Sequence, residues 1–76
     1  MTTKDQITAI REFINPRTGR KWRIKDIAEE IGRDKATVSR IVSAPDYEPG
    51  ENTMKMIDRL FERICCNNAD YIFYQH

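Results

Sequence analysis

Hydrophobic residues recur at helical spacing in four short stretches of the chain. The apolar positions of the first stretch are Ile7, Ile10, Phe13 and Ile14, which share one side of a helix. Thr3 and Gln6 have the spacing of a capping box, which closes a helix N-terminus with two reciprocal hydrogen bonds. Pro16 disfavours helical backbone at Asn15. The pattern therefore predicts a first helix that starts after Thr3 and ends before Asn15.

The segment 15–22 interrupts the helical pattern. Its Thr18-Gly19 pair is a turn signal, and both a loop and a small β-hairpin fit the composition. Trp22 is expected to be a core anchor that bridges the first helix and the segment that follows.

The second stretch predicts an amphipathic helix from Ile24 to Ile31. Its apolar face comprises Ile24, Ile27, Ala28 and Ile31, and its polar face comprises Lys25, Asp26, Glu29 and Glu30. Gly32 ends this helix, because glycine readily adopts the left-handed conformation beyond a helix C-terminus. Asp34 is placed to cap a third helix that runs to about Ser43 and stops at Ala44-Pro45.

A fourth helix is predicted after a cap at Asn52 or Thr53. Its apolar stripe consists of Met54, Ile57, Leu60, Phe61 and Ile64. The tail 67–76 contains the β-prone run Tyr71 to Tyr74. Because an exposed apolar strand edge is a liability, we expect this run to pair with another copy of the chain or to dock onto the core.

The second and third predicted helices have the spacing that two helices need to cross nearly at right angles across a tight turn. Such a crossing requires a small residue on the first helix, a residue tolerant of positive φ in the turn, and a second helix that is apolar only on its inner side. Ala28, Gly32 and the pair Val38 and Ile41 supply these three features. The expected scaffold is Ile27, Ala28, Ile31, Gly32, Val38 and Ile41.

The outer face of the third helix is suited to a groove lined by phosphates. It consists of Lys35, Ala36, Ser39, Arg40 and Ser43, which are small, hydrogen-bonding or cationic and include no carboxylate. Arg40 has the donors for two parallel hydrogen bonds to a guanine edge. Lys35 reaches a base or a phosphate, and the hydroxyls of Thr37 and Ser39 suit either contact.

The segment 24–43 resembles the helix-turn-helix motif of lac-repressor-type regulators. The resemblance is closest at Asp26-Ile27-Ala28-Glu29 and at Ala36-Thr37-Val38-Ser39-Arg40. It implies that Lys35, Ala36 and Arg40 read bases and that Thr37 and Ser39 face phosphates. We add Ser39 to the base-reading set and Ser43 to the phosphate-contacting set.

The layout of the whole chain is similar to that of the phage lambda repressor and Cro family, with a helix before the motif and a Met-Ile-Leu helix after it. This resemblance implies an all-α fold of four to five short helices, to which the tail could add a short C-terminal β-strand. Three departures are Ile24, where a phosphate-contacting Gln is common, Arg33, where the turn is usually apolar, and the loop 15–23, which is longer and more basic than usual. We expect one domain over 1–76, with the motif at 24–43 and the tail 67–76 available for dimerisation.

Charge is distributed unevenly along the chain, although the formal net charge is only +1. Residues 1–43 carry ten Lys or Arg against six Asp or Glu, whereas residues 44–76 carry three against six. Such asymmetry predicts a polarised molecule with one basic face. The acid-poor run before and within the motif supplies five candidate phosphate contacts: Arg17, Arg20, Lys21, Arg23 and Lys25.

Composition and motifs favour a soluble cytoplasmic protein without catalytic chemistry. No apolar run has the roughly 20 residues that a membrane span needs. Cys65 and Cys66 with His76 fall short of the four ligands of a zinc site, and we expect both thiols to be reduced and structural. A single terminal histidine and the lack of a glycine-rich phosphate loop predict no enzyme, no metal and no cofactor.

These features predict a small phage- or mobile-element-type repressor that binds double-stranded DNA as a homodimer on a palindromic operator. No small-molecule effector is evident in a chain of 76 residues. The alternative is a protein-interaction module, such as an antitoxin or an anti-repressor, on the same helical scaffold.

Overall fold

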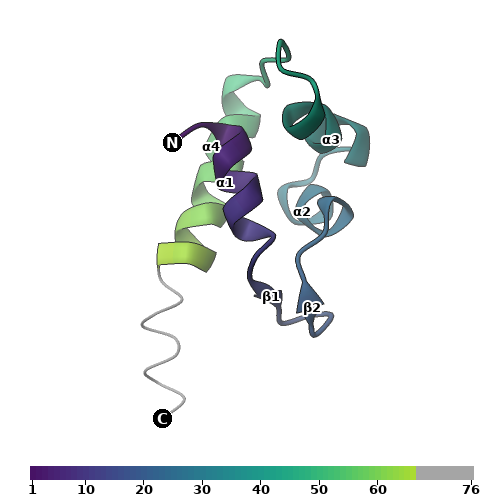
Figure 1. The fold of residues 1–76 in the computed structure, drawn as a ribbon, viewed down its shortest axis with the longest axis vertical. Coiled ribbons are helices and arrows are strands. Elements are labelled where there is room, and N and C mark those ends of the chain that lie inside the picture. The colour runs from purple at the N-terminus through teal and green to yellow at the C-terminus, as the bar shows by residue number, and fades with distance from the viewer. Residues whose placement is uncertain (67–76) are drawn as a thin grey trace.

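The computed structural model describes residues 1–66, in which four α-helices surround one core and a two-stranded hairpin lies at one end (Figure 1). The elements in chain order are α1 (Thr3–Ile10), β1 (Ile14–Asn15), β2 (Arg20–Lys21), α2 (Ile24–Ile31), α3 (Lys35–Ser43), α4 (Glu51–Phe61) and a π-helical turn η1 (Glu62–Cys66). Helix α1 packs along α4, and α2 packs against α3 (Figure 1). The expected mostly helical fold is confirmed, with the hairpin as an addition. The expectations for the tail 67–76 lie outside the described residues.

Helix α1 begins one residue earlier and ends four residues earlier than the sequence pattern predicts. Its cap is Thr2: the Thr2 Oγ1 accepts from the Asp5 backbone N at 3.1 Å, and the Asp5 Oδ2 accepts from the Thr2 backbone N at 3.2 Å. The predicted Thr3–Gln6 box is therefore wrong, because the adjacent Thr2–Asp5 pair closes the helix instead. These hydrogen bonds lower the pKa of Asp5.

Residues 13–22 form a β-hairpin, so of the two structures that the sequence allowed for this segment, a loop or a small hairpin, the hairpin is the one observed. The register pairs Ile14 with Lys21 and Asn15 with Arg20. Gly19, with φ of 73°, donates its backbone N–H to the Asn15 carbonyl at 2.8 Å and closes the turn. Because the chain leaves the helix before Phe13, Ile14 is 58% exposed instead of lying on the core side of α1.

Trp22 lies in the core, as expected. Its side chain is 6% exposed, and its backbone N donates to the Phe13 carbonyl at 3.1 Å. Phe13 itself is half-buried against the same core. The indole therefore fixes the base of the hairpin between α1 and α2.

Helices α2 and α3 have the predicted bounds, and Gly32 between them is left-handed at φ of 68°. Arg33 closes the end of α2 by donating its backbone N–H to the Ala28 carbonyl at 2.9 Å. Asp34 occupies the cap position of α3, but its side chain makes no capping hydrogen bond.

Asp26 is buried, which corrects its predicted place on the solvent-exposed face of α2. Its Oδ2 accepts from the Arg23 backbone N at 3.0 Å and from the Arg23 Nε at 3.3 Å. These two hydrogen bonds are the main causes that lower the pKa of Asp26 from its ordinary value of 3.8. The buried carboxylate of Asp26 thus caps the N-terminus of α2 by accepting from the backbone N–H of Arg23.

The Asp26→Ala variant is expected to lose about 1 kcal/mol of unfolding free energy at neutral pH, as for other lost caps. A folded-state pKa below the ordinary 3.8 means that this contribution is complete above that pH and disappears as the pH falls through the folded-state value. Urea unfolding of wild type and variant, followed by circular dichroism, should therefore give curves that differ at neutral pH and converge in acid. A difference that persists undiminished in acid would contradict this role.

Helix α4 starts at Glu51 with Gly50 at the cap position, so the predicted caps Asn52 and Thr53 are both wrong. Thr53 instead points inward and is 7% exposed, because its Oγ1 accepts from the Arg33 Nε at 3.0 Å. Met54, placed on the apolar stripe by its spacing, is 40% exposed.

The core draws side chains from all four α-helices and from Trp22. Its members are Ile7, Ile10, Trp22, Ile27, Ala28, Ile31, Val38, Ile41, Ile57 and Leu60. The expected scaffold residues of α2 and α3 are thus all buried, apart from Gly32 in the turn. Phe61, Ile64 and Cys65 pack half-buried against the same cluster.

Two further observations concern the described part of the chain, residues 1–66. No helix there has the length and apolarity to cross a membrane. No group of three or more His, Cys, Asp or Glu side chains there is arranged to hold a metal ion.

Candidate nucleic-acid interface

Helix α3 presents to solvent the face that the sequence singled out. Val38 and Ile41 point into the core, while Thr37 and Val42 are half-buried at the borders of the helix. The exposed residues are Lys35, Ala36, Ser39, Arg40 and Ser43. The predicted base-reading residues therefore lie together on one accessible surface, which we call the α3 face.

The packing of α2 against α3 leaves the α3 face outside the core. Ala28 is 2% exposed in the packed core, where a small side chain lets the two helices approach closely. Gly32 reverses the chain with a backbone conformation that other residues rarely adopt. The three-residue connection 32–34 then leads into α3, which packs against α2 with its apolar side inward.

The cations of the α3 face are available for a ligand. Within residues 1–66, neither Lys35 nor Arg40 has a carboxylate within ion-pair distance or a side-chain hydrogen-bond partner. No Asp or Glu occurs anywhere in α3. An anionic partner would thus meet two cations without ion-pair partners and no carboxylate on the face itself, although the exposed Asp34 stands at the cap position beside Lys35.

The hydroxyl groups of the α3 face differ from one another. The Ser43 Oγ donates to the Ser39 carbonyl at 2.8 Å, so its proton is used within the helix. The Ser43 hydroxyl then has no proton to donate to a phosphate oxygen, which is itself an acceptor. This hydrogen bond weakens the predicted role of Ser43 as a phosphate contact. The Ser39 side chain has no such bond to any residue of 1–66, so within this range its donor is available to a ligand.

The five cations of the run 17–25 are all exposed, but three of them are already paired. Arg17 Nη2 lies 3.3 Å from Glu30 Oε2, Lys21 Nζ lies 3.4 Å from Glu12 Oε2, and Arg23 Nε lies 3.3 Å from Asp26 Oδ2. Arg20 and Lys25 have no such partner among residues 1–66. The run is thus not a uniform basic patch, as its composition suggested.

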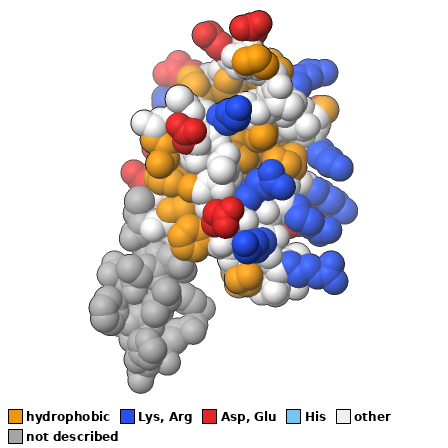
Figure 2. All heavy atoms as spheres, in the orientation of Figure 1, with side chains coloured by type: hydrophobic (Ala, Val, Ile, Leu, Met, Phe, Trp, Pro, Cys, Tyr) orange, Lys and Arg blue, Asp and Glu red, His pale blue; other side chains and the backbone are white. Residues whose placement is uncertain are grey.

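The face of the molecule drawn in Figure 2 has its basic and acidic side chains on different sides. Figure 2 shows Lys and Arg side chains gathered along the edge of the molecule that is formed by the hairpin, α2 and α3. Acidic side chains lie mainly at the end near the loop between α3 and α4 and over the side of α1 and α4 (Figure 2). The basic edge therefore continues the α3 face rather than opposing it.

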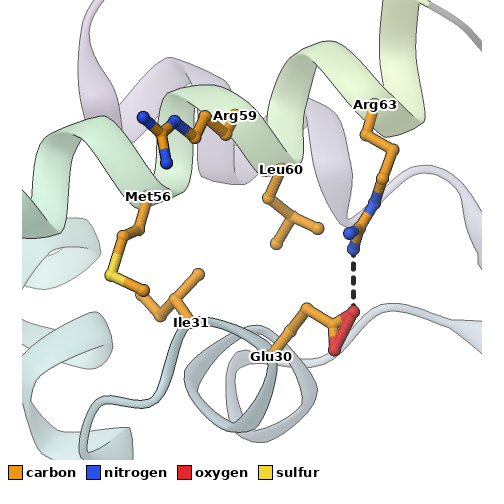
Figure 3. A pocket seen from close by; sticks show the side chains of 6 residues that line it. All are labelled: Glu30, Ile31, Met56, Arg59, Leu60 and Arg63. Carbon is orange, nitrogen blue, oxygen red and sulfur yellow. Dashed lines mark hydrogen bonds and ion pairs between the residues drawn. The ribbon is translucent and has the colours of Figure 1, made fainter.

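Sequence reasoning missed the carboxylate of Glu30, which joins three elements. Its Oε1 lies 2.7 Å from Arg63 Nη2 of η1, and its other oxygen binds Arg17 of the hairpin. A pocket of about 240 Å³ lies beside this pair. Figure 3 shows the Arg63–Glu30 ion pair at one end of it, with Ile31 and Leu60 among the side chains that line it. Partners 13 and 33 residues away leave no local signal in the sequence.

This pocket lies apart from the α3 face. All of its lining residues belong to α2, α4 and η1. The structure therefore leaves the α3 face as the surface that best combines exposure, uncompensated charge and small side chains. No protein-family model, curated protein or solved structure matches this chain.

Proposed function

We propose that this protein is a sequence-specific DNA-binding transcriptional regulator that inserts α3 into the major groove. The observation that carries the proposal is the α3 face itself. It is exposed, contains no carboxylate and carries two cations that have no ion-pair partner among residues 1–66. The helix-turn-helix resemblance of the segment 24–43 supports the same reading.

The chemistry of the face fits the edges of base pairs. The major groove, about 12 Å wide, admits an α-helix, and small side chains at the contact allow a close approach. Ala36 and Ser39 leave that space, while Arg40 has the donors for a bidentate contact to guanine N7 and O6. Lys35, at the first position of α3, reaches either a base or a phosphate.

The proposed assembly is a cytoplasmic homodimer that binds a palindromic operator. Two copies would place their α3 helices about 34 Å apart, one helical turn of DNA, on the same side of the duplex. A domain of this size would act by covering a promoter, which is the behaviour of a repressor. A phage or mobile-element origin fits the Cro-like layout of the sequence.

Arg40→Ala is expected to weaken binding to the preferred site by about 1–3 kcal/mol and to relax the base preference at one position. The preferred site is first selected from a random duplex pool, and its affinity is then measured by fluorescence anisotropy. Because Arg40 is exposed and unpaired, the variant should unfold at the wild-type temperature.

Lys55→Ala is the matched control for this measurement. It removes one exposed cation from the side of α4 that faces away from the core, where its partner is Glu51 at 3.6 Å. Binding by this variant should stay within about twofold of wild type, because an exposed pair outside the contact contributes little. Equal losses in the two variants, or an unchanged base preference in Arg40→Ala, would remove Arg40 from the reading role.

A further inference from the structure

We infer that the β1–β2 hairpin and the first turn of α2 form a second DNA contact, in which Arg20 and Lys25 bind backbone phosphates while Arg17 does not. This inference rests on the proposed function and extends it from the groove to the sugar-phosphate backbone. It divides the basic run 17–25 by the ion pairs that the structure shows, and not by composition.

The register of the hairpin separates Arg20 from its neighbour Lys21. Successive side chains of a strand point to opposite faces. Lys21 lies opposite the exposed Ile14, and its Nζ is 3.4 Å from Glu12. Arg20 lies opposite the buried Asn15, so it belongs to the face of the hairpin that is turned toward α2.

The position of Asn15 fixes which helix that face meets. A small cavity lies between the hairpin and α2, and its lining residues are Asn15, Arg17, Thr18, Trp22, Asp26, Glu29 and Glu30. The side of the hairpin that carries Arg20 is therefore the side next to α2, whose first turn carries Lys25. Figure 2 shows the Lys and Arg side chains of this region continuing along one edge toward α3.

Arg20 and Lys25 differ from Arg17 in their ion pairing. Arg17 is paired with Glu30, a carboxylate with a side chain only 18% exposed. Among residues 1–66, no carboxylate lies within 4.0 Å of the terminal nitrogens of Arg20 or Lys25, although Glu29 stands one turn beyond Lys25. A cation without a partner gains most from a phosphate, and each phosphate that it neutralises releases condensed counterions.

The test is the salt dependence of binding to a duplex of random sequence, measured for four full-length proteins. Each neutralised phosphate contributes a slope of about −0.9 to log K against log salt concentration. Arg20→Ala and Lys25→Ala should each make the wild-type slope shallower by about 0.9, and they should weaken preferred and random duplexes by the same factor.

Arg17→Ala is the matched control, because it removes an exposed arginine from the same hairpin and leaves Glu30 paired with Arg63. Its slope should equal that of wild type. An unchanged slope in either Arg20→Ala or Lys25→Ala, or an equal change in Arg17→Ala, would overturn the inference while wild-type binding still supported the proposed function. Wild-type protein that binds no duplex would overturn both.

Discussion

The Ala36→Glu variant is expected to lose DNA binding by about 100-fold or more. Ala36 is exposed in the first turn of α3, between the two cations of the α3 face, Lys35 and Arg40. A carboxylate there would meet the phosphate-lined groove, and the juxtaposition of like charges costs several kcal/mol. Since 1.4 kcal/mol corresponds to a factor of ten in affinity, a 100-fold loss corresponds to about 2.8 kcal/mol. This loss is at or above the upper end of the range of about 1–3 kcal/mol expected for Arg40→Ala.

The fold itself should tolerate this change. Glutamate has a good helix propensity and is favourable near a helix N-terminus. The matched control is Asn52→Glu, since Asn52 is exposed and is the second residue of α4 as Ala36 is of α3. Thermal unfolding should be near wild type for both variants, and anisotropy should show full binding for the control alone. Binding by Ala36→Glu within threefold of wild type would place the DNA elsewhere.

Ile57→Ala is expected to destabilise the domain by about 2–5 kcal/mol. Ile57 is fully buried, and its helix α4 packs against both α1 and α2. Native stability is roughly 0.05–0.15 kcal/mol per residue, so a chain of 76 residues has only about 4–11 kcal/mol to lose. The variant should therefore lose a large share of its stability, and its DNA binding should weaken in proportion to the fraction of unfolded protein although Ile57 lies inside the protein.

Urea unfolding followed by circular dichroism measures this effect. Met54→Ala is the matched control, because Met54 is a large apolar residue on the same helix but is 40% exposed. We expect its midpoint to fall far less than that of Ile57→Ala. Equal midpoints for the two variants would contradict the packing of α4.

The sequence predicted α2, the turn and α3 well because their determinants are local. Ala28, Gly32 and the apolar pair Val38 and Ile41 are all encoded within 14 consecutive residues. The bounds Ile24–Ile31 and Lys35–Ser43 and the exposure of the α3 face followed directly from these spacings. Their role in reading DNA remains a prediction.

The ends of α1 and α4 were harder to predict, because neighbouring residues compete for the same position. Thr2 and Thr3 are both good caps, and the choice depends on whether Asp5 or Gln6 closes the box. In α4, Thr53 and Met54 compete for the core side. The contact from Arg33, 20 residues away, favours the polar residue.

The state of the basic run could not be predicted from the sequence because it depends on contacts between elements. Arg17 and Arg63 meet at Glu30 only once the hairpin, α2 and η1 are packed together. Asp26 is a different case, because its partner Arg23 is only three residues away. The helical pattern placed Asp26 on the solvent-exposed face and missed the local cap that its carboxylate forms with Arg23. The sequence contains five cations in this run, and within the described part of the chain two of them have no ion-pair partner.

The most direct test of DNA binding is a titration of the wild-type protein with a random-sequence duplex at 50 and 200 mM salt. Two or more phosphate contacts predict an affinity at least about tenfold weaker at the higher salt concentration. No detectable binding at 50 mM would contradict a DNA-binding function and would favour a protein-interaction module, such as an antitoxin or an anti-repressor.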